Sequence, residues 1–364
     1  MTEKLPPHKR PDVKMVGTAS DKEKRKRVKE YNDRFGEKHF FQFPAEGKDL
    51  KAAEYELRPH EGHFISRANE ITNGLRERFG LQPFDMPEEN FHVLPPDKYV
   101  ELGGSADTYA STNIRMQAVL ARATEFRLSP ILAAGDVLHE IVHIKGAFIE
   151  EAHNTKESDE VNIRSKDAKK QKIKGGPYRV GFEVFGTYVK AERENKSVPN
   201  SFEGLNEAVV AEIEKRFLPR VLEGAPGIEE EIDRLNSPGV WEAKAEVATR
   251  AKRDISEIYW ISENGEDARL FSYYHQRQVL YFLVNCIAED NPDMSKDEIM
   301  DMFFEGEFTG HLIEIVRKIK QAFGDDAFRF IGTMTKEDNS ARLTLDYLKK
   351  KRRLLLKRRA FQDS

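Results

Sequence analysis

The stretch Ser129-Pro-Ile-Leu-Ala-Ala-Gly-Asp-Val-Leu-His-Glu-Ile-Val-His-Ile-Lys-Gly146 decides how the rest of the chain is interpreted. A serine side chain can accept the free amide hydrogens at a helix start, so Ser129 is suited to cap a helix there. Pro130 favours the first helical position, and Gly146 can adopt the left-handed conformation that ends a helix. We therefore predict one helix bounded by Ser129 and Gly146.

Within this helix, His139-Glu140-Ile-Val-His143 has the pattern HExxH. Residues i and i+4 of an α-helix share one face, so both imidazoles can reach one metal ion, and Glu140 can hold the water that the metal polarises. The positions around them are mostly apolar, which indicates a buried helix. Two histidines and a glutamate are costly to bury without a partner. The pattern therefore favours a metal site over histidines that serve only in the core.

A catalytic zinc ion needs a third protein ligand and an open position for water. The metzincin pattern would place a histidine where this chain has Ile149, so that class of site is excluded. His153 could ligate, but it opens a polar stretch, 153–171, that we interpret as a loop. Glu207 is the better candidate, and Zn²⁺ is the predicted cofactor.

Helical spacing supports Glu207 only in part. An apolar stripe that starts at Leu205 repeats every four residues, and Glu207 lies off this stripe beside glycine and alanine positions. Such small residues would let this helix approach the HExxH helix closely. Glu203 and Glu214 fall near the same azimuth, so spacing alone leaves them as further candidates.

Together, His139-Glu140-x-x-His143 and Asn206-Glu207-Ala208 resemble the motifs of the gluzincins, the thermolysin-like zinc metallopeptidases. The resemblance covers about 100–220 in motif and roughly 60–290 in layout. It implies that His139, His143 and Glu207 ligate zinc. It also implies an α+β fold, with a zincin-like lobe of a small mixed sheet and the HExxH helix, followed by a mainly helical C-terminal lobe.

The chain departs from this family just after the second motif. The family has Ser-Asp where this chain has Val210-Ala211, so the acid that orients a zinc histidine is missing from its usual place. Glu212 is a candidate substitute. We therefore interpret the chain as a remote gluzincin-like protein.

The resemblance implies hydrolysis of peptide bonds in a peptide or protein substrate. Zinc would polarise the scissile carbonyl and its bound water, and Glu140 would take the water proton and pass it to the leaving amine. A Tyr or His would stabilise the oxyanion. For that role we favour Tyr273 over its neighbours Tyr274 and His275, with Tyr178 as a further candidate.

Four regions are predicted along the chain. They are a charged N-terminal arm (1–55), the zincin lobe (56–200), a helical lobe that carries the third ligand (201–345) and a basic tail (346–364). Apolar spacing predicts a helix over 65–79, and short or alternating apolar patterns predict strands over 90–94, 112–118 and 178–184.

Charge is distributed unevenly along the chain. The net charge is -4, yet 349–359 carry 8 basic residues and no acid, whereas 36–348 carry 40 basic and 56 acidic residues. A basic tail can contact nucleic acid or an acidic partner, or it can pair within the molecule. Two alternatives to a gluzincin therefore stay open: a zincin-fold interaction protein that binds metal without turnover, and a nucleic-acid-associated protease that resembles the SprT-like group.

Composition indicates a globular protein of a reducing compartment. No run of residues reaches the roughly 18 apolar positions of a membrane span, and 1–12 contain no apolar signal segment. Cys286 is the single cysteine, which excludes an intramolecular disulfide and a thiolate zinc cluster. We therefore expect a cytoplasmic protein without a membrane span.

Overall fold

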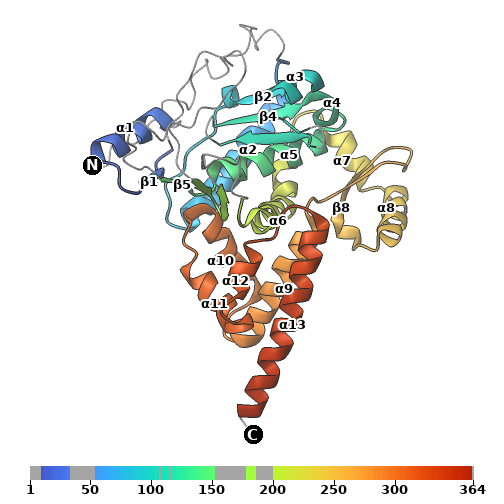
Figure 1. The fold of residues 1–364 in the computed structure, drawn as a ribbon. Coiled ribbons are helices and arrows are strands. Elements are labelled where there is room, and N and C mark those ends of the chain that lie inside the picture. Colours follow the sequence, from blue (N-terminus) through green and yellow to red (C-terminus); the bar gives the residue numbers. More distant parts are fainter. Residues whose placement is uncertain are drawn as a thin grey trace, which may run out of the picture.

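The computed structural model of the chain describes residues 10–32, 54–102, 104–105, 108–114, 117–151, 178–185 and 200–362. Helices and small sheets are mixed in this part of the chain, which confirms the expected α+β class (Figure 1). The helices are α1 (Asp21–Asn32), α2 (Pro59–Arg78), α3 (Pro96–Glu101), α4 (Ala123–Phe126), α5 (Pro130–Lys145), α6 (Glu203–Leu222), α7 (Glu229–Leu235), α8 (Pro238–Ala251), α9 (Tyr274–Asp290), α10 (Lys296–Thr309), α11 (Ile313–Phe323), α12 (Ala327–Ile331) and α13 (Asp338–Gln362), with short 3₁₀ turns at Glu88–Asn90 and Ile255–Glu257.

Three small sheets accompany the helices. The strands are β1 (Lys14–Val16), β2 (Phe91–Leu94), β3 (Ala110–Asn113), β4 (Ala118–Arg122), β5 (Phe148–Glu151), β6 (Tyr178–Val180), β7 (Glu183–Phe185), β8 (Ile258–Ile261) and β9 (Ala268–Leu270). They form the sheets β2-β4-β3, β1-β5-β6-β7 and β8-β9. The first two are mixed sheets, because β2 is parallel to β4 and β1 is parallel to β5, whereas the other neighbours are antiparallel.

Two predicted strands are each folded into a hairpin. The chain over 112–118 turns between β3 and β4, where Gln117 adopts a φ of 54° and donates a 2.5 Å hydrogen bond to the Tyr31 carbonyl. The chain over 178–184 turns between β6 and β7 at Gly181, whose φ is 53° and where a Cβ would overlap the buried carboxylate of Glu307. Both single-strand predictions were therefore wrong. Tertiary contacts fix a turn in each segment, and the alternating apolar pattern of the sequence does not indicate these turns.

The helix α5 begins as the sequence predicts. The Ser129 hydroxyl accepts a hydrogen bond from the Ile131 amide at 3.2 Å, and Pro130 occupies the first position. The expected left-handed cap at Gly146 is wrong, because its φ is -57°. The free carbonyls at this end have other partners.

Those partners are two buried arginines from distant parts of the chain. The guanidinium of Arg10 donates to the carbonyls of Ile144, at 2.6 Å, and of Gly146. Arg76 of α2 donates to the Lys145 carbonyl at 2.9 Å. Cations at a helix C-terminus also complement its dipole, so the arginines both satisfy and stabilise this end.

One acid and one ring hold the two arginines in place. Asp12 pairs with Arg10 at 3.2 Å and with Arg76 at 3.1 Å. Both guanidinium carbons lie over the ring of Phe84, at 5.6 Å and 4.7 Å, and the Lys145 amine lies 5.4 Å from the same ring. Burial holds the pKa of Lys145 well below its usual range. The N-terminal strand β1 is thereby attached to the end of α5.

The helix α6 lies across α5 and is held at its own start by the C-terminal part of the chain. The amides of Phe202 and Gly204 donate to the carbonyls of Gly332 and Met334, each at 2.8 Å. A Cβ at Gly204 would lie 2.5 Å from the Thr335 carbonyl, so only glycine allows this approach. The main hydrophobic cluster runs through both predicted lobes, from Tyr31 to Leu348.

Other sequence expectations have mixed outcomes. The helix predicted over 65–79 and the strand predicted over 90–94 correspond to α2 and β2, and α2 starts earlier. The loop predicted from His153 to Gln171 lies outside the described residues. Across the ranges that the structure describes, no helix is both long and apolar enough to cross a bilayer.

Replacing Arg10 tests the attachment of the N-terminal strand. We expect Arg10→Ala to lower the free energy of unfolding by about 3 kcal/mol, because it leaves Asp12 and two carbonyls buried with fewer partners. Urea unfolding followed by circular dichroism measures this. Lys14→Ala is the matched control, since Lys14 is an exposed cation on the same segment; an equal, small effect of both variants would contradict the role of Arg10.

Candidate metal centre

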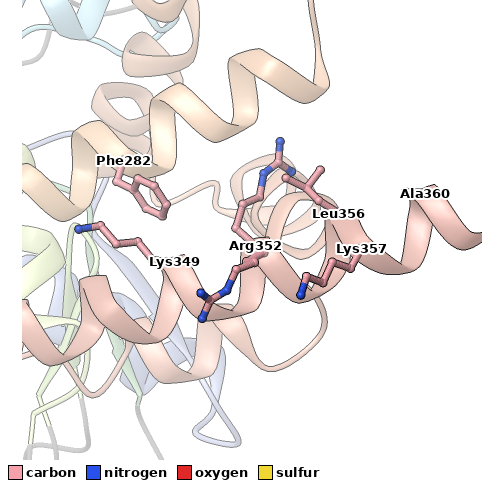
Figure 2. A pocket seen from close by; sticks show the side chains of 7 residues that line it. Phe282, Lys349, Arg352, Leu356, Lys357 and Ala360 are labelled. Atoms are coloured by element: carbon pink, nitrogen blue, oxygen red, sulfur yellow. The ribbon is translucent and has the colours of Figure 1, made fainter.

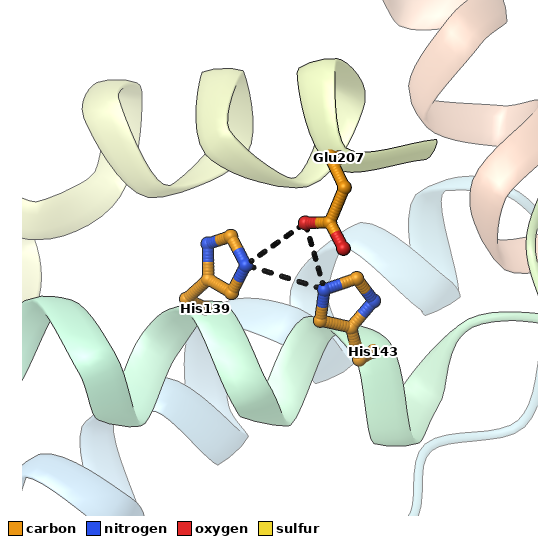
Figure 3. Close-up of side chains that lie close together, drawn as sticks. All are labelled: His139, His143 and Glu207. Carbon is orange, nitrogen blue, oxygen red and sulfur yellow. Dashed lines mark hydrogen bonds and ion pairs between the residues drawn. The ribbon is translucent and has the colours of Figure 1, made fainter. Parts of the chain in front are cut away.

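Three side chains from α5 and α6 point at one spot (Figure 3). The Nε2 atoms of His139 and His143 lie 3.2 Å apart, and Glu207 Oε2 lies 3.3 Å from the first and 3.4 Å from the second. The two histidines are one turn apart on α5, and Glu207 reaches them from the first turns of α6. The three ligand atoms therefore form a nearly equilateral triangle.

This triangle fits a tetrahedral metal ion. Donors bound to zinc at roughly 2.0–2.1 Å in a tetrahedron lie about 3.3–3.4 Å from one another, which is close to the three observed distances. Glu207 Oε2 is buried and finds no hydrogen-bond partner in the described part of the chain. Two imidazole nitrogens and one carboxylate oxygen are also a donor set of catalytic zinc sites. The group could hold a metal ion.

The outer nitrogens of both imidazoles have partners on α6. His139 Nδ1 lies 3.0 Å from Glu214 Oε2, and His143 Nδ1 lies 3.4 Å from the side-chain nitrogen Nδ2 of Asn206. The Asn206 oxygen is itself fixed by the amide of Phe182 at 2.8 Å. His139 can donate from Nδ1 to Glu214, which leaves its Nε2 lone pair facing Glu207 as a metal ligand. The side-chain nitrogen of Asn206 is a donor, so its contact orients the His143 ring without selecting that tautomer.

The charges at the centre reinforce one another. Burial opposes protonation of His139, but its contacts with Glu207 and Glu214 outweigh burial and raise its pKa well above the usual value. Burial also disfavours ionisation of Glu207, yet the two histidines hold the pKa of its carboxyl well below the usual range. Glu207 is therefore ionised.

Further carboxyls surround the centre. Burial, followed by the charges of Glu214 and Glu140, raises the pKa of Asp136 to about 8, and burial with the charge of Glu207 does the same for Glu183. Burial is the larger cause of both shifts, and nearby negative charge adds to it. A bound cation would offset this negative charge.

Glu140 and Tyr273, the two residues predicted for catalysis, flank the centre. The Thr112 hydroxyl, on β3, donates a hydrogen bond to the side-chain carboxylate of Glu140. The same hydroxyl also lies 3.3 Å from the backbone carbonyl oxygen of Glu140. The Tyr273 ring stacks on that of His139 with centroids 6.0 Å apart, and its φ of 55° turns the chain into α9. The carboxylate of Glu207, followed by burial, raises the pKa of Tyr273 well above its usual value, so its hydroxyl stays protonated.

The other candidates from the sequence have different partners. Glu203 accepts from the Lys336 amide at 3.3 Å, and Tyr178 stacks on Phe185, 4.4 Å between centroids. Tyr274 lies under Arg253, whose guanidinium is 3.5 Å from the ring centre. His275 lies 3.1 Å from a nitrogen of the same arginine. None of the four belongs to the described cluster, and His153 lies outside the described residues.

Glu212 was the candidate for the acid that orients a zinc histidine, and this prediction is wrong because its carboxylate contacts neither histidine. Its carboxylate contacts Arg216 at 2.7 Å and the Tyr281 hydroxyl. Glu214 takes that position instead. It lies seven residues after Glu207, two helical turns along the same face, so the spacing could have identified it as an orienting residue rather than as a rival ligand. The role of Thr112 had no sequence pattern to indicate it.

Comparison of the chain with profiles of protein families, with curated proteins and with solved structures finds no match. Function is therefore inferred from the chemistry of the centre itself.

We expect the purified protein to carry about one zinc ion per chain and Glu207→Ala to lose it, because two imidazoles alone form an incomplete site. Elemental analysis after gel filtration measures zinc per chain. Glu203→Ala is the matched control, one turn earlier on α6, and should keep its zinc. Equal zinc contents in the two variants would place the third ligand elsewhere.

Glu214→Gln should weaken zinc binding about 10- to 100-fold without removing a ligand, because the amide holds His139 less firmly than the carboxylate does. Competition with a fluorescent zinc chelator measures the affinity. Glu212→Gln is the control, since Glu212 contacts Arg216 and Tyr281. If both variants bind zinc as the unmodified chain does, Glu214 has no orienting role.

Proposed function

We propose that the protein is a zinc-dependent metallopeptidase of gluzincin type that hydrolyses peptide bonds. The observation that carries this proposal is the triangle of His139, His143 and Glu207, whose sides of 3.2–3.4 Å fit one face of a zinc tetrahedron. Three protein ligands would leave a bound zinc ion with one position for water or substrate. Zinc at this position would supply a Lewis acid that polarises a carbonyl and lowers the pKa of bound water.

Glu140 is the proposed general base. It is adjacent to His139 in sequence, and its side chain is buried, with only 7% of its surface exposed. The Thr112 hydroxyl donates to one carboxylate oxygen and so fixes the orientation of the group. The carboxylate can then accept a proton from water and return it to the leaving nitrogen of the scissile peptide.

Tyr273 is the proposed oxyanion stabiliser. Its ring is held against His139, and its hydroxyl stays protonated because the charge of Glu207 and burial raise its pKa. A protonated hydroxyl beside the centre can donate a hydrogen bond to a developing oxyanion. Its position as the residue just before α9 also brings the helical part of the chain to the centre.

The layout supports the gluzincin resemblance. The mixed sheet β2-β4-β3 and α5 would be the zincin-like lobe, and α6 with α9 to α13 would be the helical lobe. The Asn206-Glu207 pair begins the second lobe, as the resemblance implies. We keep a cytoplasmic location as part of the same proposal, given that Cys286 is a buried free thiol.

Glu140→Gln separates a peptidase from a protein that only binds metal. The amide keeps the shape of the side chain but cannot accept a proton, so we expect cleavage of a mixed peptide library to fall about 10² to 10⁴-fold. Zinc content and thermal stability should stay as in the unmodified chain, because Glu140 is not a ligand. Mass spectrometry of the cleaved peptides gives the rates.

Glu203→Gln is the control for this experiment, because it changes a nearby carboxylate outside the cluster and should keep full activity. Equal residual cleavage by Glu140→Gln and by the unmodified chain would identify a contaminant and refute the peptidase. Loss of zinc from Glu140→Gln would show that Glu140 is a ligand.

A further inference from the structure

A groove lies between α9 and α13 and shares no residue with the metal centre. It holds about 520 Å³ and is lined by Phe282 of α9 and six residues of α13. Figure 2 shows the ring of Phe282 facing the side chains of α13 across the groove. In Figure 1, α13 extends beyond the body of the molecule, and Arg353, Leu356 and Lys357 of the groove are exposed.

Three basic residues of α13 are neutralised within the molecule. Arg352 pairs with Asp290 at 2.8 Å and with Glu289 at 3.1 Å. Arg359 pairs with Asp290 at 3.1 Å, and Lys351 with Asp326 at 3.7 Å. The pairs with Glu289 and Asp290 anchor α13 against α9, and the pair with Asp326 links it to the start of α12. These contacts explain part of the basic tail without any partner.

The segment 349–359 contains five other basic residues, and these make no ion pair with a described residue. Lys349, Arg353 and Lys357 line the groove, whereas Lys350 and Arg358 do not. The three lining residues are four positions apart, so their charges form a row with steps of about 6 Å along the helix. We call them the basic row.

Apolar groups lie beside the basic row. Phe282, Leu356 and Ala360 line the groove, and Leu356 exposes 45% of its surface. Leu354 is 46% exposed and Phe361 is 83% exposed on the same helix. A partner that covers these side chains removes apolar surface from water and thereby gains affinity.

The basic row and the apolar side chains beside it together favour one class of anionic partner. A phosphodiester backbone would neutralise the basic row but would leave Phe282 and Leu356 in water. A flat bilayer would meet the projecting end of α13, where Leu354 and Phe361 are exposed, and vesicle binding is therefore the competing outcome of the test below. An amphipathic helix with carboxylates beside an apolar face can satisfy both kinds of group at once.

We propose that this groove binds an acidic amphipathic helix of a partner protein. The apolar face of the partner lies on Phe282 and Leu356, and its carboxylates meet the basic row. This inference is independent of the peptidase proposal, because no residue is shared between the two sites.

The test uses the full chain and a fluorescein-labelled synthetic helix of 18 residues, with leucines on one face and glutamates along both edges. Fluorescence anisotropy should show saturable binding. Arg353→Glu/Lys357→Glu should weaken binding about tenfold or more, since two attractions become repulsions. The matched control, Lys350→Glu/Arg358→Glu, reverses the same number of charges on the same helix outside the groove and should change affinity less than about twofold.

Leu356→Ser separates groove binding from attraction to any polyanion. It should weaken peptide binding about fivefold and leave the binding of inorganic polyphosphate unchanged, because phosphates gain nothing from Leu356. Circular dichroism checks that every variant keeps its helices. Absence of peptide binding, equal loss in both double variants, or no effect of Leu356→Ser would overturn the proposal. Tighter binding to phosphatidylserine vesicles than to the peptide would overturn it in favour of a membrane surface.

Discussion

The structure depends on placing charged groups in the largely buried interface between α5 and α6. His139 lies between Glu207 and Glu214, so each of its two ring nitrogens contacts a carboxylate. An unpaired charge in such an interface would cost several kcal/mol, whereas the pairs stabilise one another. The small side chains at Gly204 and Ala208, both buried, let the two backbones approach closely enough for these contacts. These contacts therefore allow α6 only one rotation about its own axis when it packs against α5.

The sequence predicts the parts of the site that depend on one helix. Ser129 and Pro130 define the start of α5, and the i, i+4 spacing of His139 and His143 fixes a common face, as the structure shows. The identity of the third group followed from the Asn206-Glu207 motif, and the structure brings Glu207 to the two histidines. These features are local, so they can be read from the chain without knowing how its parts pack.

The features that the sequence could not predict depend on distant partners. Gly146 was expected to end α5 in a left-handed turn, but Arg10 and Arg76 satisfy the carbonyls that such a turn would have served. The turn at Gln117 is fixed by a hydrogen bond to Tyr31 from the N-terminal helix. Glu212 and Glu214 both lie on α6, and only the position of α5 shows which of them faces His139. In each case the missing information is a contact between segments far apart in the sequence.

The way in which α6 starts has a consequence for the order of events during synthesis. Its first amides are held by the carbonyls of Gly332 and Met334, one turn away from Glu207. Chains are made from the N-terminus, and segments fold as they become available. A nascent chain therefore exposes both imidazoles long before it contains the residues that hold Glu207 in place. The last contacts that support the start of α6, near Glu207, can therefore form only after nearly the whole chain has been made.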